Sequence, residues 1–324
     1  MADVLVPAGP PPAPTGGGPA PALSPARSPG LSPGLSPGPA PRWRLTRRQG
    51  GSGADSKARR IGDWALIGLL VLVTVIAVLA PALAPHDPVQ PIAVPKLPPF
   101  TDLDHILGSD QIGRDTLSRV LVGLRTSWLL ALVVTAVGLL VGTIVGLVAG
   151  MFGGWVDALL MRTTEVFLAL PSMLVAVAVA AALGPGLFNT FLAVIVVWWP
   201  YYARIIRGEV RGIMARPHVE AARMAGVGRM RVMWRHVLPG VVPTAVITAS
   251  LDIGNVVMVL ASLSFLGMGQ PAPAPELGSD TSRGLVEILD AWWIPLVPGL
   301  VVMLLSLLSN LAGDAVRNRL AHRR

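Results

Sequence analysis

Long apolar runs separated by short polar stretches dominate the chain from residue 61 onward. Six runs are long enough to cross a lipid bilayer as helices, because about 20 residues rising 1.5 Å each span the ~30 Å hydrocarbon core. They are predicted at Trp64–Leu83, Ser127–Gly150, Trp155–Leu183, Leu187–Ile206, Pro243–Met268 and Trp292–Ala315. The third run is interrupted by Arg162, Glu165 and Pro171. The pattern predicts an all-α integral membrane protein with six transmembrane helices.

Tryptophan and tyrosine residues stand near most ends of these runs. Their rings are largely apolar but carry a polar group, and such side chains settle at the boundary between lipid and water. The residues concerned are Trp64, Trp128, Trp155, Trp198, Trp199, Tyr201, Tyr202, Trp292 and Trp293. We therefore expect these side chains at the membrane interfaces.

The first 60 residues differ in composition from the rest of the chain. They hold 13 proline and 10 glycine residues, and a Ser-Pro-Gly-Leu pattern repeats from Ser28 onward. Such a segment has too little apolar surface to offset the entropy lost on ordering. We predict a disordered cytoplasmic tail at residues 1–60 and a transmembrane domain at 61–324, with its core at about 127–316. Binding of the tail by a partner that recognises proline-rich segments stays open.

Composition and charge narrow the class of protein. Of the 324 residues, 52% are hydrophobic and only 14% are charged, whereas soluble domains average about 25% charged residues. The net charge of +8 fits either a nucleic-acid binder or a membrane protein with basic cytosolic edges. With the N-terminus inside, 21 of the 26 lysine and arginine residues fall on the inner side, as the positive-inside rule requires. We expect both termini in the cytoplasm and no nucleic-acid partner.

Groups that would carry catalysis or hold a metal do not occur at the spacings such sites need. The chain has no cysteine, which excludes disulfides, thiol catalysis and cysteine-held clusters. No histidine pair has a metal-binding spacing, and neither a serine-nucleophile motif nor a phosphate-binding Gly-x-x-x-x-Gly-Lys motif is present. The five histidines are His86, His105, His218, His236 and His322. We therefore expect no catalytic residue, no metal site and no cofactor in this chain.

The polar connection at residues 204–236 has a pattern of its own. The residues that form this pattern extend from the connection into the start of the next apolar run. They are Glu220, Ala221, Ala222, Gly226, His236, Leu238 and Pro239. Adjacent alanines let a helix approach a surface closely, Gly226 tolerates the positive φ of a sharp reversal, and Pro239 suits the first turn of a helix. The arginines around them are free to pair with an acidic partner or anionic lipid; they are Arg207, Arg211, Arg216, Arg223, Arg229, Arg231 and Arg235.

This spacing resembles the coupling loop of binding-protein-dependent ABC importers. Further segments, in order along residues 61–320, resemble the dipeptide, oligopeptide and nickel permeases of that family. They are Leu107–Asp110, Gly113–Asp115, Ser118–Ser127, Ala149–Arg162 with Pro171, Leu263–Gly269 and Asn310–Arg317. The resemblance implies the type I ABC importer permease fold and points to the C-type subunit, which has six helices.

The resemblance also implies a function and a set of partners. The chain would be the channel-forming permease of an ATP-driven importer for dipeptides or oligopeptides in a bacterial plasma membrane. It would assemble with a homologous permease, two cytosolic ABC ATPase subunits and an extracytoplasmic solute-binding protein, and the ATPases would hold ATP and Mg²⁺. Glu220, Ala221, Ala222 and Gly226 would form the helix that docks on an ATPase, with alternating access by rigid-body rocking. The alternatives are a permease for nickel or another small chelate, and a secondary transporter.

Four glycines at four-residue intervals mark one face of the second apolar run. They are Gly138, Gly142, Gly146 and Gly150. Small residues let membrane helices pack at short distance. The spacing therefore favours tight packing within the subunit or against the partner permease, and a lining of the transport pathway is the alternative.

Two polar residues stand near the middle of the fifth run. Asp252 and Asn255 are three residues apart and so share a helix face. A carboxylate inside the membrane normally faces a partner or a water-filled cavity, because facing lipid costs about 3 kcal/mol or more. Two interpretations stay open: contact with the amino end of a peptide in the pathway, and a structural hydrogen bond to another helix. Arg162 and Glu165 are also three apart and are predicted to form a local ion pair.

Overall fold

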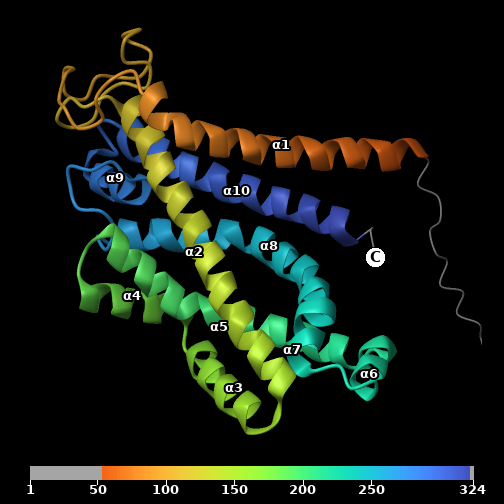
Figure 1. The fold of residues 1–324 in the computed structure, drawn as a ribbon. Helices are drawn as coiled ribbons and strands as arrows, with labels where there is room; N and C mark the ends of the chain where they lie inside the picture. The colour runs from red at the N-terminus through yellow and green to blue at the C-terminus, as the bar shows by residue number, and fades with distance from the viewer. Residues whose placement is uncertain (1–52, 322–324) are drawn as a thin grey trace, which may run out of the picture. The chain divides into compact units, whose positions relative to one another are not determined.

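The computed structural model describes residues 53–321, which are mainly helical (Figure 1). The five long helices are α1 (Gly53–Leu83), α2 (Thr116–Phe152), α5 (Leu187–Met214), α8 (Leu238–Phe265) and α10 (Trp293–Ala321). The shorter ones are α3 (Gly154–Ala169), α4 (Ser172–Leu183), α6 (Pro217–Met224), α7 (Arg229–Val232) and α9 (Leu277–Gly284). The expected all-α membrane architecture is confirmed. The tail predicted at 1–60 lies outside the described residues, except that residues 53–60 already belong to α1.

Five helices in the described range are long and apolar enough to cross a membrane, and the third predicted span is a bent pair. α3 and α4 meet at 90° across Leu170 and Pro171. Proline has no N–H to continue a helix and disfavours the helical conformation in the residue before it. Leu170 is accordingly extended, with φ −93° and ψ 146°. The expected single span is therefore broken where Pro171 interrupts it.

The bent pair still carries the chain from one end of the bundle to the other. Asp157, near the start of α3, pairs with Arg207 near the end of α5. The residue before α5, Gly186, donates its N–H to the carbonyl of Met268, which follows α8 (3.2 Å). We call the end that holds α6 the α6 end, and the opposite end, with residues 84–115 and 266–292, the loop end. Counted this way, α3 and α4 make one crossing and the bundle has six.

The helices extend beyond the apolar runs that predicted them, and this changes the place of two aromatic residues. α2 begins at Thr116 rather than Ser127, with Asp115 as its N-cap. Trp128 is therefore inside the helix and fully buried, and its Nε1 donates to Thr74 Oγ1 of α1 (3.0 Å). Tyr202 is likewise fully buried, because α5 continues to Met214. These two rings are therefore packed inside the bundle, against neighbouring helices.

The glycine face of α2 lies against α5. A Cβ atom added at Gly142 would lie 2.5 Å from Cβ of Tyr202, and one added at Gly146 would lie 2.7 Å from the carbonyl oxygen of Ala203. At Gly150 the nearest atom would be a methyl of Val210 at 2.6 Å, while Gly138 faces the Tyr202 ring at 3.4 Å. Only glycine lets the two backbones approach this closely. The structure thus places all four glycines at a helix contact within this subunit.

The start of α1 and the end of α10 lie side by side at the α6 end (Figure 1). Arg319 of α10 lies 3.6 Å from the carboxylate of Asp63 and 4.6 Å from the centre of the Trp64 ring. A guanidinium over an indole ring gains a cation–π attraction in addition to the ion pair. The first and last described helices are therefore joined by specific contacts.

Candidate functional sites

The α6 helix is a short exposed helix anchored by one apolar side chain. Pro217 lies in its first turn, where the missing N–H has no partner to lose. Val219 is fully buried in an apolar cluster with Ile213 of α5 and Val232 of α7. Glu220 and Ala221 are exposed and Ala222 is half-buried. The Glu-Ala part of the motif therefore faces outward from the bundle.

Gly226 ends α6 with a reversal of the chain. Its φ is +79°, a left-handed conformation that glycine adopts without a Cβ clash. Its N–H bonds to the carbonyl of Arg223 (3.0 Å), and the N–H of Val227 bonds to the carbonyl of Ala222 (3.1 Å). These two bonds are those of a Schellman cap. Glycine is thus required here by the backbone, which fixes the direction in which α6 is presented.

The separate part of the predicted 204–236 connection is shorter than expected. Residues 204–214 continue α5, and a single helix runs from Arg229 through Phe265. Pro239 lies in the first turn of α8, as expected, and α7 with a π-helical turn continues the helix before it. Just before it, Met233–Val237 form a π-helical turn in which Leu238 donates its N–H to the carbonyl of Met233. Such a turn accommodates a proline that leaves one carbonyl without its usual i+4 donor. His236, half-buried in this turn, lies near His218 of α6, with ring centres 6.2 Å apart.

Large apolar side chains are exposed around α6. The exposed fractions are 84% for Met224, 60% for Met230 and 60% for Trp234. Methionine and tryptophan are common at protein–protein contacts. Exposed arginines surround them, at Arg216, Arg223, Arg229, Arg231 and Arg235. The α6 end therefore presents a mixed apolar and basic surface.

Two of the arginines expected to pair with a partner bind within the chain instead. Both oxygens of Asp157 accept hydrogen bonds from Arg207, the Nη2 bond measuring 2.6 Å, and Arg211 also binds this carboxylate. A bidentate guanidinium–carboxylate contact is among the stronger ion pairs. Asp157 therefore ties the start of α3 to the end of α5, next to α6. The predicted pair of Arg162 and Glu165 is present at 3.3 Å and is exposed.

Asp252 is buried between α5 and α8. It is 5% exposed, and its Oδ2 accepts hydrogen bonds from Tyr202 Oη (2.6 Å) and from Trp198 Nε1. Asn255 approaches Oδ1 at 3.4 Å but is itself exposed. The two polar residues that share a helix face therefore differ in surroundings, because Asp252 is buried against α5 whereas Asn255 is exposed.

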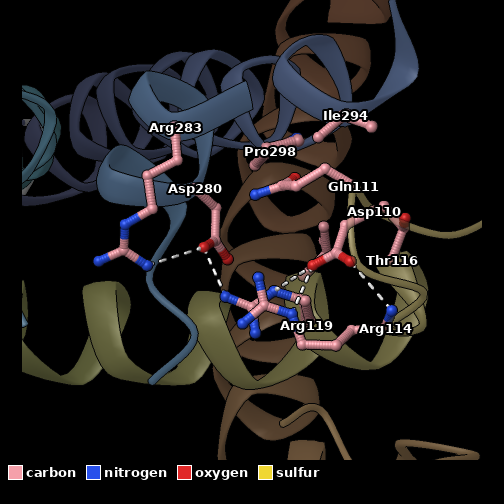
Figure 2. A pocket seen from close by; sticks show the side chains of 10 residues that line it. Asp110, Gln111, Arg114, Thr116, Arg119, Asp280, Arg283, Ile294 and Pro298 are labelled. Atoms are coloured by element: carbon pink, nitrogen blue, oxygen red, sulfur yellow. Dashed lines mark hydrogen bonds and ion pairs between the residues drawn. The ribbon is translucent and has the colours of Figure 1, made fainter. Parts of the chain in front are cut away.

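At the loop end, charged side chains from distant segments line a small open pocket (Figure 2). Arg119 of α2 lies between two carboxylates, 2.6 Å from Asp280 Oδ1 of α9 and 3.8 Å from Asp110. Arg114 also binds Asp110 (2.5 Å), and Arg283 points toward Asp280 at 3.7 Å. These ion pairs connect the segment before α2 to α9. The motif residues at 107–119 thus hold the loop end together.

Glu276, beside this network, is buried, and Asp280 within it is half-buried. Burial raises the pKa of Glu276, whose carboxylate accepts hydrogen bonds from Ser264 Oγ (2.5 Å) and from the N–H of Gln270 (2.6 Å). Burial also raises the pKa of Asp280, although Arg119 beside it acts in the opposite direction. Desolvation disfavours the charged form of a carboxyl group and here outweighs its partners.

Comparison with known proteins identifies the family. The family described as "Binding-protein-dependent transport system inner membrane component" matches residues 142–323, from the glycine face of α2 through α6 to the end of α10. The chain belongs to this family. The resemblance seen in the sequence is confirmed, and the chain is a membrane permease component of an ABC importer.

Named relatives match this permease over most of their length. The probable D,D-dipeptide transport system permease protein DdpC of Escherichia coli K12 is 38% identical over 78% of this chain and 84% of its own. The di/tripeptide transport system permease protein DppC of Pseudomonas aeruginosa is 38% identical over 79% and 87%, and the dipeptide transport system permease protein DppC of Escherichia coli K12 is 39% identical over 79% and 88%. Among solved structures, a chain of the inward-facing MetNI methionine ABC transporter is 20% identical, covering 62% of this chain and 96% of its own, with a TM-score of 0.49.

Proposed function

We propose that this permease is the channel-forming subunit of an ATP-driven importer for dipeptides or short oligopeptides. The similar permeases named above serve dipeptide and di/tripeptide transport systems. The observation that carries the coupling role is α6, a helix that is anchored by Val219 and leaves Glu220 and Ala221 exposed. An anchored helix with a free outer face transmits the movement of a docked partner to the helices α5 and α8 on either side of it.

The proposal includes an orientation and a set of partners. The α6 end, with most of the basic residues, faces the cytoplasm, and the loop end faces outward, in keeping with the positive-inside rule. Two cytosolic ATPase subunits, a homologous permease and an extracytoplasmic binding protein complete the importer. The partner ATPases bind ATP and Mg²⁺, and this chain contributes no catalytic group. The mixed apolar and basic surface around α6 supports docking of a protein partner there.

Within the membrane, the proposal assigns Asn255 rather than Asp252 to the face that meets the transport pathway or the partner permease. Asn255 is exposed in this subunit, whereas both oxygens of Asp252 are engaged by groups of the same chain. An exposed amide in the middle of an apolar helix is costly against lipid but not against water or a partner. Asp252 instead holds α8 against α5.

Reversal of the charge at Glu220 tests the coupling role. In cells that carry the complete importer, Glu220→Arg should reduce dipeptide uptake about tenfold or more. The docked ATPase would lose its contact with the carboxylate of Glu220, and any basic group of the ATPase at that point would be repelled by the new arginine. The amount of permease in the membrane should not change, since Glu220 is exposed. The ATPase should co-purify with this variant less than with the wild type.

Asp104→Arg is the matched control, because it reverses an exposed carboxylate at the loop end. Its uptake should stay near that of the wild type. Normal uptake and normal recovery of the ATPase with Glu220→Arg would show that α6 does not dock on the ATPase.

A further inference from the structure

His86, His105 and Asp115 meet at the loop end although the sequence separates them by 19 and 10 residues. His86 follows α1, Asp115 is the N-cap of α2, and His105 lies in the connection between them. One nitrogen or carboxylate oxygen from each side chain lies within 4.8 Å of those of the other two. No metal site was expected from the sequence, because no histidine pair has a metal-binding spacing along the chain. Such spacing cannot detect side chains that only the folded loop brings together.

Asp115 is held in a fixed orientation. Its side chain is fully buried, and its Oδ2 accepts hydrogen bonds from the N–H (2.8 Å) and Oγ (2.6 Å) of Ser118. The other oxygen, Oδ1, lies 3.1 Å from Nδ1 of His105, which is also buried. Hydrogen bonds that orient a carboxylate in this way are typical of the surroundings of metal ligands.

His86 supplies an atom that the described structure leaves without a partner. Its Nδ1 is shielded from solvent and makes no hydrogen bond. It lies 3.9 Å from Oδ2 of Asp115, and its ring centre is 4.7 Å from that of His105. Buried polar atoms without a partner are rare in proteins and call for an explanation such as an ion. Here the unpartnered nitrogen lies next to the same carboxylate that His105 contacts.

We propose that His86, His105 and Asp115 bind one divalent transition-metal ion of the zinc type. Two imidazole nitrogens and one carboxylate oxygen form a set that suits zinc, whereas calcium and magnesium prefer oxygen ligands alone. Ligand atoms bound at about 2.1 Å in a tetrahedral site are about 3.4 Å apart. Nδ1 of His105 lies 3.1 Å from Oδ1 of Asp115 and Nδ1 of His86 lies 3.9 Å from Oδ2, so the two nitrogens approach different oxygens of one carboxylate at distances on either side of that value. Small side-chain rotations, chiefly of the half-buried His86, complete the site, and water takes the fourth position.

The ion would have a structural effect that a plain histidine–carboxylate pair lacks. It joins His86, shortly after the end of α1, to the N-cap of α2 and to His105 in the connection between the two helices. An ion that binds the folded chain and not the unfolded chain stabilises the folded state. We therefore expect added Zn²⁺ to raise the unfolding temperature of the full-length permease, and the extent of this rise to depend on His86.

Zn²⁺ binding to the full-length chain tests the proposal. The permease is purified without a histidine tag, stripped with a chelator, and titrated with Zn²⁺ and separately with Co²⁺. We expect one Zn²⁺ per chain and the visible absorption of four-coordinate Co²⁺. His86→Ala should weaken Zn²⁺ binding about tenfold or more and abolish the Zn²⁺-dependent rise in unfolding temperature. This variant leaves the hydrogen bonds of Asp115 to Ser118 and His105 in place, so it is expected to fold.

Two variants serve as controls. Asp104→Asn removes an exposed carboxylate of the same connection, and His218→Ala disrupts the other histidine pair; both should bind Zn²⁺ like the wild type. Equal binding by His86→Ala and the wild type would overturn the proposal. The absence of Zn²⁺ binding by the wild type at low micromolar concentration would also overturn it. The three residues would then be a hydrogen-bonded pair of His105 and Asp115 with the ring of His86 packed beside that of His105.

Discussion

Charged residues inside the bundle are satisfied by groups of the same chain. Asp252 binds Trp198 and Tyr202, and Asp157 binds two arginines of α5. An ionised carboxylate in an apolar environment is tolerated only when donors surround it. At the scale of single residues, then, these carboxylates connect helices, and donors from α5 stabilise each of them.

Asp252→Asn tests this assignment. Asparagine replaces one carboxylate oxygen with an NH₂ group, so at least one of the donors from Trp198 and Tyr202 loses strength or its partner. We expect the permease to lose about 1–3 kcal/mol of stability, measured as a lower unfolding temperature in detergent. Tyr202→Phe, which removes one donor, should act in the same direction. The ratio of uptake for a neutral and a cationic dipeptide should not change, and a changed ratio with unchanged stability would favour contact with the peptide.

At the scale of elements, the contact between α2 and α5 depends on residues that are small. Gly142, Gly146 and Gly150 face backbone or Cβ atoms of α5 at distances that no other side chain permits. Close approach maximises van der Waals contact, which drives helix association where water is absent. The contact lies within one subunit, so it acts before any partner is bound.

Gly142→Leu should therefore damage the subunit itself. Its Cβ atom would collide with Tyr202 and with the carbonyl of Trp199, and overpacking of this kind costs about 1–3 kcal/mol or more. The measurement is thermal unfolding and the folded fraction of the isolated permease. Gly68→Leu is the matched control, because nothing lies within 4 Å of the Cβ position at this glycine of α1. A stable Gly142→Leu subunit that fails only to bind its partner would place the contact between subunits.

The sequence predicted which segments are helical more reliably than where the helices end. Hydrophobicity marks the apolar part of α2 but not its first turns, which carry Arg119 and Arg125 and are fixed by the cap at Asp115. It likewise could not show that Arg207 and Arg211 would be bound by Asp157, because that contact joins residues about 50 positions apart. The Glu-Ala-Ala and Gly226 pattern was visible since both its helix and its cap are local. The convergence of His86 with Asp115 depends on the folded loop and leaves no periodic signal.

At the scale of the whole molecule, the loop end is a part whose stability responds to pH. Burial raises the pKa of Glu276 above its ordinary value of 4.5, so the folded chain binds this proton more tightly than the unfolded chain does. The resulting stabilisation is complete below pH 4.5 and is lost as the pH rises through the raised pKa. Asp280, whose pKa burial also raises, acts in the same direction.

Unfolding temperatures measured between about pH 5 and pH 8 should show this dependence. The wild type should lose stability as the pH rises, and Glu276→Gln should show a shallower slope because glutamine does not titrate. Asp280 keeps part of the slope in that variant. Asp104→Asn, at an exposed position, should retain the full slope. If Glu276→Gln and the wild type have identical slopes, Glu276 does not control the pH response.

The contact of Arg319 with Asp63 and Trp64 has a consequence for biogenesis. A ribosome makes α1 before the other described helices and α10 after them, so α1 enters the membrane with its Asp63 and Trp64 not yet matched. The helix can pack on α2 early, but its second neighbour, α10, is made only after all the helices between them. Closure of the bundle therefore waits for the synthesis of α10, and a product truncated before residue 319 would leave Asp63 without this cation.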